Sequence, residues 1–68
     1  MNPYEQLQLN KELEAIAKQQ IEIHKKRIKL SEELEQDLDN KELQNRIIEL
    51  EEESQKLKKK SEDLQANY

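Results

Sequence analysis

The sequence contains no cysteine, glycine, tryptophan or phenylalanine, and only one proline and one histidine. Without cysteine, the fold has neither disulfide bonds nor thiolate metal sites, and nothing indicates an oxidising compartment. A lone histidine argues against a structural metal site as well. A chain of 68 residues cannot bury a large core, and a compact fold of this size normally needs such cross-links or oligomerisation. We therefore expect association with other helices to stabilise it.

The residues that are present favour helix. Glu, Lys, Leu, Gln, Ile and Ala dominate the composition, and most of these are strong helix formers. Charged residues make up 41% of the chain and hydrophobic residues 32%, a balance that could also suggest disorder. The helical periodicity of the apolar residues favours an ordered chain over a disordered one. The prediction is an all-α protein in which residues 1–68 form a single helical domain.

Charge is spread evenly along the chain. The net charge is −4, from 12 basic and 16 acidic residues, and residues 1–38 and 39–68 each hold six basic and eight acidic side chains. An acidic chain without a basic arm does not favour nucleic acid or anionic lipid. No apolar run approaches the length of a membrane span or a signal peptide. We expect a soluble, cytoplasmic protein with no membrane partner and no nucleic-acid partner.

Two apolar stripes follow the heptad spacing of coiled coils, alternating steps of four and three residues. Side chains beside the stripes, namely Ala17, Ile21, His24, Ile28 and Ile48, widen the apolar face, which indicates more than one neighbouring helix. The first stripe comprises Leu9, Leu13, Ile16, Gln20, Ile23, Arg27, Leu30 and Leu34. The second comprises Leu43, Ile47, Leu50, Ser54, Leu57, Ser61, Leu64 and Tyr68.

The two stripes are out of phase. Leu34 and Leu43 are nine residues apart where unbroken heptads require ten, so one straight helix would carry the stripes on nearly opposite faces. We predict that the chain folds back instead, as an antiparallel αα-hairpin of the coiled-coil type. Its arms span about 3–38 and 41–67, and its turn about 39–41. The alternative is a continuous long helix in a parallel coiled coil.

Local signals support a break near residue 40. Asn2 and Pro3 suit a helix start, with Asn2 as the cap. Asp39, followed three residues later by Glu42, resembles a capping box in front of the second stripe. Glycine, which helix ends prefer, is missing, although Asn67 could end the second helix.

Folding back about Asn40 and Lys41 pairs residues whose numbers add up to 80 or 81. A register shifted by four residues, with a longer loop, remains open and sets Arg27 against Leu50. The favoured register places Lys26, Arg27 and Lys29 near the acidic residues 51–53. Its layers are Leu38 with Leu43, Leu34 with Ile47, Leu30 with Leu50, Arg27 with Ser54, Ile23 with Leu57, Gln20 with Ser61, Ile16 with Leu64 and Leu13 with Tyr68.

The predicted functional residues are those that pack helices together. Four polar positions within the stripes are expected to set register and partner number; they are Gln20, Arg27, Ser54 and Ser61. The predicted interface comprises Leu13, Ile16, Ile23, Leu30, Leu34, Leu38, Leu43, Ile47, Leu50, Leu57 and Leu64. We expect a non-enzymatic, structural or regulatory module for protein–protein interaction. It would oligomerise, preferably as a homodimer forming a four-helix bundle, or bind another helical protein.

Catalytic, cofactor and metal sites are not expected. His24 has no cysteine to act on and the nearest serine is Ser31, two helical turns away. The acidic runs carry carboxylates at i, i+3 and i+4, but the Glu-x-x-His pattern of bundle di-metal sites is missing. The basic runs at residues 24–27 and 56–60 have no interleaved aromatics for stacking on bases.

One fragment, Leu30-Ser31-Glu32-Glu33-Leu34-Glu35, resembles the Ser-Gln-Glu-Leu-Asp signature of small sporulation-type aspartyl-phosphate phosphatases. These are short helical hairpins that act on phosphorylated response regulators, so the resemblance implies an alternative function in phosphoryl signalling. Two positions depart from the signature: Glu32 stands where Gln is expected, and Glu35 stands where the critical Asp belongs.

Overall fold

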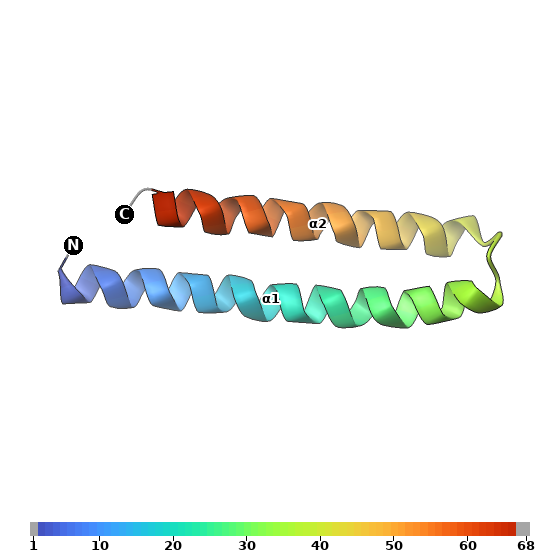
Figure 1. Cartoon of the computed structure of the whole chain (residues 1–68), viewed down its shortest axis with the longest axis horizontal. Coiled ribbons are helices and arrows are strands. Elements are labelled where there is room, and N and C mark those ends of the chain that lie inside the picture. Colours follow the sequence, from blue (N-terminus) through green and yellow to red (C-terminus); the bar gives the residue numbers. More distant parts are fainter. Residues whose placement is uncertain (1, 67–68) are drawn as a thin grey trace.

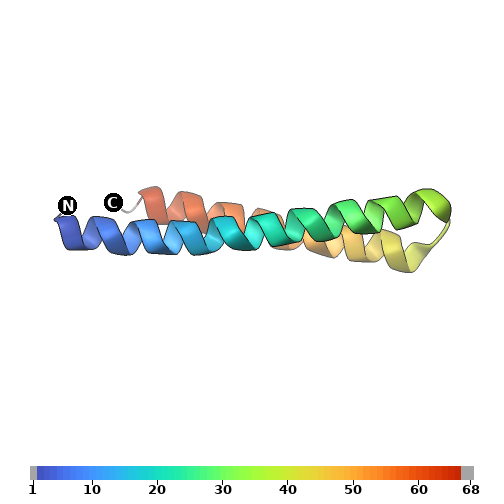
Figure 2. The same ribbon diagram turned by 90° about the horizontal axis from the view of Figure 1, so that it is seen from below.

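The chain is a helical hairpin. The computed structural model describes residues 2–66, which form two helices, α1 (Pro3–Gln36) and α2 (Lys41–Ala66), joined by residues 37–40. The helices run antiparallel and side by side, so that the start of α1 and the end of α2 lie at the same end of the molecule (Figure 1). Viewed from below, they cross at a shallow angle (Figure 2). The predicted hairpin is confirmed, and the alternative of one continuous helix is wrong.

The molecule is elongated rather than globular. Its principal extents are 53 × 16 × 11 Å and its radius of gyration is 15.9 Å, whereas a compact domain of this length has a radius of about 11 Å. With 34 residues, α1 is longer than α2, which has 26. The first turns of α1 therefore extend beyond the described end of α2 (Figure 1).

The start of α1 follows the prediction. Asn2 caps the helix, because its side-chain oxygen accepts a hydrogen bond of 2.8 Å from the backbone N–H of Glu5. Pro3 occupies the first turn, where its missing N–H leaves no helical hydrogen bond unmade. The predicted role of Asn67 lies outside the described residues.

The turn differs from the prediction. Helix α1 ends at Gln36, before the expected residue 38, and the connection is 37–40 rather than 39–41. The capping residue of α2 is Asn40 and not Asp39, since the Asn40 side-chain oxygen accepts from the N–H of Leu43 at 3.1 Å. An amide can also donate, and Asn40 Nδ2 reaches the Asp37 carboxylate at 3.3 Å. A carboxylate at this position could only accept, which gives asparagine the advantage as a link between the two helix ends.

The turn also needs no glycine. No residue from 2 to 66 has a positive φ, so the chain reverses with ordinary backbone angles. Gln44 secures the connection by donating from Nε2 to the carbonyl of Leu38 at 2.7 Å. The side chain of Leu38 is 68% exposed in this turn. Its predicted layer with Leu43 is therefore wrong.

The helices adopt the register that the sequence left as the alternative, shifted by four residues. The Gln20 side chain hydrogen-bonds Ser54, whereas the predicted register puts Gln20 beside Ser61, about 10 Å farther along α2. The predicted layers of Gln20 with Ser61 and Arg27 with Ser54 are wrong for this reason. The predicted layer that includes Tyr68 falls outside the described residues.

The sum of the residue numbers of facing partners distinguishes this register from the predicted one. Two straight antiparallel helices advance equally, so the residue numbers of facing partners should add up to one value. In the register shifted by four residues, the stripe members pair with a sum of 77 throughout, from Leu34 with Leu43 to Leu13 with Leu64, whereas the sums in the predicted register were 80 or 81. The observed contacts of Gln20 with Ser54 and of Arg27 with Glu51 have sums of 74 and 78, on either side of 77. The predicted register was chosen because it pairs apolar with apolar residues. This criterion was misleading, because in the shifted register each polar member of a stripe lies in the same layer as an apolar one.

The core is a single line of side chains between α1 and α2. Four apolar residues are less than one-tenth exposed; they are Leu9, Ile16, Ile23 and Leu50. Every other member of the two stripes within the described residues is half-buried. The side chains predicted to widen the apolar face, Ala17, Ile21, His24, Ile28 and Ile48, are all exposed.

Candidate interaction surface

The predicted packing residues hold the two helices of one chain together. Apart from Leu38, each of the eleven predicted interface residues is buried or half-buried along the line where α1 meets α2. Each such residue therefore has its contacts within the hairpin. Any surface for a second molecule must be sought among other side chains.

The polar positions Gln20 and Ser54 meet in this line. Gln20 Nε2 donates to the backbone carbonyl of Ser54 at 2.9 Å, and the Ser54 hydroxyl donates to Gln20 Oε1 at 2.7 Å. Both hydrogen bonds are partly buried, and they form only when the two helices are in this register. Ser61 is also half-buried on the line.

The fourth polar position, Arg27, reaches out of the line toward solvent. Its Nη2 lies 3.0 Å from Glu51 Oε1, and the two side chains are 35% and 51% exposed. The prediction that Arg27 lies near the acidic residues 51–53 is therefore confirmed for Glu51. The Nε of Arg27 is buried and makes no hydrogen bond within the part of the chain that the structure describes.

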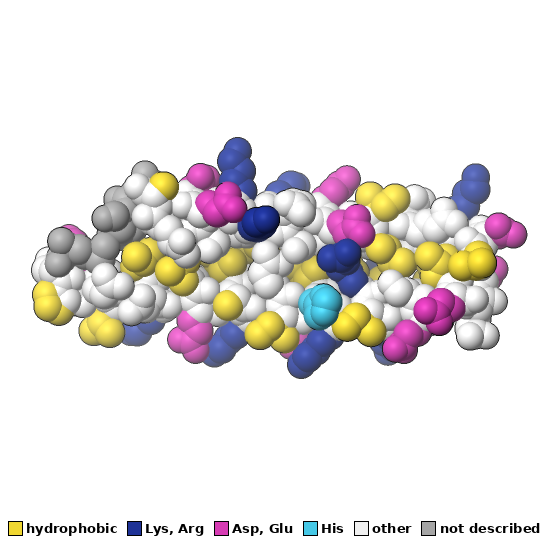
Figure 3. Space-filling model, viewed as in Figure 1, with side chains coloured by type: hydrophobic (Ala, Val, Ile, Leu, Met, Phe, Trp, Pro, Cys, Tyr) yellow, Lys and Arg dark blue, Asp and Glu magenta, His cyan; other side chains and the backbone are white. Residues whose placement is uncertain are grey.

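An exposed apolar stripe runs along α1 beside this ion pair. Ile21 is 54% exposed and Ile28 47% exposed, and the exposed Ala17 and His24 continue their spacing of four and three residues. This is a second heptad stripe on the same helix. In Figure 3 the histidine lies between clusters of hydrophobic side chains along α1.

Helix α2 adds Ile48, which is 51% exposed, to the same side of the hairpin. Arg27 connects the two parts: one surface hollow of about 350 Å³ contains Arg27 with His24 and Ile28, and another of about 570 Å³ contains Arg27 with Ile48 and Glu51. We call Ile21, His24, Ile28 and Ile48 the isoleucine face. The Arg27–Glu51 ion pair crosses its middle.

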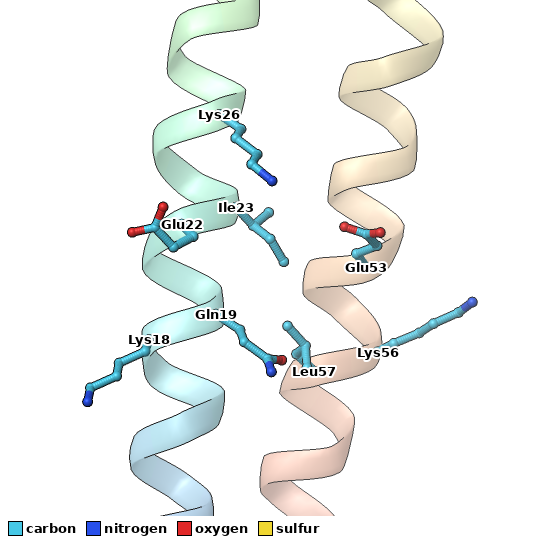
Figure 4. Close-up of a pocket in the computed structure, with 8 residues that line it drawn as sticks. All are labelled: Lys18, Gln19, Glu22, Ile23, Lys26, Glu53, Lys56 and Leu57. Carbon is cyan, nitrogen blue, oxygen red and sulfur yellow. The ribbon is translucent and has the colours of Figure 1, made fainter.

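A further groove, of about 550 Å³, lies between the helices one turn nearer the open end. Ile23 and Leu57 point toward each other across its floor, while Lys18 and Lys56 extend away from it (Figure 4). Its lining contains no serine, threonine, cysteine or histidine. Within residues 2–66, no three His, Asp or Glu side chains gather closely enough to hold a metal ion.

The phosphatase-like fragment occupies the last turns of α1. Leu30 and Leu34 face α2 and are half-buried, whereas Ser31, Glu32 and Glu35 are exposed. These three exposed residues line the same hollow as His24 and Ile28.

Comparisons with known protein families, with curated proteins and with solved structures find no match. Neither of the two helices, over the residues described, is long and apolar enough to cross a membrane. The geometry of the hairpin is therefore the basis for a functional assignment.

The sequence did not reveal the two relationships that matter most for this surface. The Gln20–Ser54 contact depends on the register, and the constant sum of facing residue numbers indicates the register but not this contact. The residues that flank the first stripe indicated part of the isoleucine face. Its extension to Ile48 follows only when α2 is placed beside α1.

Proposed function

We propose that this chain is a non-enzymatic association module whose hairpins pair side by side as a homodimer, forming a four-helix bundle. The observation that carries the proposal is the exposed isoleucine face, whose heptad spacing is that of a helix-packing surface. Large apolar side chains grouped on one side of a small hairpin are typical of an interaction site. A second pair of helices would cover them.

The surface area of the hairpin supports pairing. The chain of 8.2 kDa exposes 5641 Å², whereas a compact monomer of this mass exposes about 4,500 Å². The excess of about 1,100 Å² is comparable with the roughly 800 Å² that each partner contributes to a standard interface. A dimer interface of standard size would therefore reduce the exposed surface of each chain to about that of a compact monomer of the same mass.

The small core leads to the same proposal. Four side chains below one-tenth exposure give a hairpin a narrow margin over the conformational entropy of ordering its residues. Burying further isoleucines against a partner adds roughly 1.5–3 kcal/mol for each side chain that becomes fully buried. Association and folding are then linked, and the stability depends on protein concentration.

Sedimentation equilibrium together with circular dichroism tests the proposal. We expect a helical species with twice the chain mass of 8.2 kDa, which dissociates and loses helix together on dilution. Substituting a residue of the intramolecular core, as in Leu34→Asp, should remove both helix and association, because it separates α1 from α2. A fully helical species of 8.2 kDa at high micromolar concentration would overturn the proposal.

A further inference from the structure

We propose that the second copy docks on the isoleucine face in an antiparallel orientation, with a two-fold axis passing between His24 and Ile28, at the level of Arg27. This inference rests on the proposed homodimer and adds the surface and the orientation. Three features of the hairpin lead to it: a positively charged region, a negatively charged region, and the position of the isoleucine face along the molecule.

The first charged region lies toward the open end of the hairpin. In the observed register, residues 16–21 of α1 and 56–61 of α2 are at the same level along the long axis, and neither segment contains Asp or Glu. Together they form a belt of positive charge; Lys18 lies 3.3 Å from Glu14, so the lysines of α2 supply its net charge. We call it the lysine belt; it comprises Lys18, Lys56, Lys58, Lys59 and Lys60.

The second charged region is the turn. Residues 30–47, which include the last turns of α1, the connection and the start of α2, hold six carboxylates and only two cations. We call this segment the acidic turn end. Its carboxylates belong to Glu32, Glu33, Glu35, Asp37, Asp39 and Glu42, and its cations to Lys41 and Arg46.

Folding creates this separation. Read along the chain, acidic and basic residues are equally divided between the two halves, because each half contributes to both regions. Doubling the chain at residues 37–40 brings like charges to the same level. The hairpin consequently has one positive region and one negative region, with centres about 24 Å apart at 1.5 Å per helical residue.

The isoleucine face lies between the two regions. Ile21 and Ile28 stand on either side of His24, and Ile48 of α2 is level with Ile28 and residue 29 of α1. A two-fold axis through this face brings the face of one copy onto the same face of the other. Such an interface is self-complementary, as a symmetric dimer requires.

The charges decide the orientation. In an antiparallel pair, the lysine belt of each copy lies beside the acidic turn end of the other, which gives two favourable contacts. In a parallel pair, lysine belt faces lysine belt and turn end faces turn end. Like charges facing each other across an interface disfavour that arrangement, so the antiparallel pair is favoured.

The surface is tested with variants matched in residue type. Ile21→Asp and Ile28→Asp should weaken dimerisation roughly a hundredfold or more, because each substitution occurs twice in a symmetric dimer. Helix content at high protein concentration should fall far less than for Leu34→Asp, since both isoleucines lie outside the hairpin core. Ala17→Asp and Ala15→Asp form the control pair: both alanines are exposed on α1, and only Ala17 lies beside the isoleucine face. Ala17→Asp should weaken the dimer, and Ala15→Asp should leave it intact.

The orientation is tested with spin labels, which the absence of native cysteine makes straightforward. Labels on Asp39→Cys should be about 40 Å apart in an antiparallel dimer, and labels on Lys25→Cys, next to the axis, less than about 25 Å apart. A short distance at both positions would overturn the antiparallel orientation. A dimer that survives both Ile21→Asp and Ile28→Asp would overturn the choice of surface and leave the proposed function standing. A wild-type monomer would overturn both.

Discussion

Gln20 and Ser54 hydrogen-bond each other twice across the hairpin, each acting once as donor and once as acceptor. Two features make this pair more than a tolerated polar contact. The carbonyl of Ser54 belongs to the backbone of α2, so the position of the whole helix is held and not just that of one side chain. A slip of α2 by one heptad that sets Gln20 beside Ile47 and Ser54 beside Leu13 would leave both side chains partly buried and unpaired, which costs about 1–3 kcal/mol for each unsatisfied group.

Replacing Gln20 by Ala should lower the free energy of unfolding by about 1–3 kcal/mol, because the hydrogen bonds to Ser54 are lost and the site is partly buried. Urea denaturation followed by circular dichroism at fixed protein concentration measures the change. The matched control is Gln19→Ala, since Gln19 is the preceding residue and is exposed. Equal effects at both positions would contradict a special role for the pair.

Arg27 is a polar member of the first stripe whose interactions are only partly satisfied. Its ion pair with Glu51 is partly exposed, and such pairs contribute only about 0–1 kcal/mol. Opposed to this contribution, the Nε of Arg27 is buried and makes no hydrogen bond to any residue from 2 to 66. Arg27→Leu should therefore raise the free energy of unfolding by about 1 kcal/mol or more, because the apolar side chain shares a layer with Leu50.

The measurement for Arg27→Leu is the midpoint of urea denaturation, and Glu51→Gln is its control. Glu51→Gln removes the ion pair alone and should change the stability by less than about 1 kcal/mol. A loss of stability in Arg27→Leu would show that the guanidinium stabilises the fold.

The hairpin was predictable because the number of residues between the two stripes indicates it. Nine residues between Leu34 and Leu43, where ten are required, put two stripes on opposite faces of any straight helix, and the chain must then fold back to bury both. The register was not predictable by the same reasoning. Pairing apolar with apolar residues matched the two stripes well in the wrong alignment, whereas the observed alignment brings Gln20 to Ser54 and Arg27 to Glu51.

The charge separation could not be read from the linear sequence either. The lysines at residues 56–60 and Lys18 are far apart in the chain and meet only through the fold. The isoleucine face was partly visible in advance, since Ile21 and Ile28 continue a heptad spacing beside the first stripe. What the sequence lacked was the position of α2, which adds Ile48 and encloses Arg27 between two apolar groups.

Leu50 and Leu38 offer a direct comparison of a core leucine with an exposed one. Leu50 is 9% exposed and Leu38 68% exposed, although both were predicted to pack between helices. Leu50→Ala should lower the free energy of unfolding by about 2–4 kcal/mol, since it removes buried methyl groups and leaves a cavity. Leu38→Ala should change it by less than about 0.5 kcal/mol. Thermal or urea denaturation of both variants checks this, and comparable losses would contradict the open turn.

Asn40 caps the start of α2. Asn40→Ala removes the side-chain oxygen that accepts from the Leu43 N–H and the amide that reaches Asp37, so it should destabilise the hairpin by about 1–2 kcal/mol. Asn40→Asp should retain the cap but lose the donated hydrogen bond and set two carboxylates beside each other, giving an intermediate loss that diminishes at high salt. Asp39→Ala is the control, because the capping function lies one residue later; it should have little effect. If Asp39→Ala proved the more damaging substitution in urea denaturation, α2 would begin one residue earlier and the link between Asn40 and Asp37 would not define the turn.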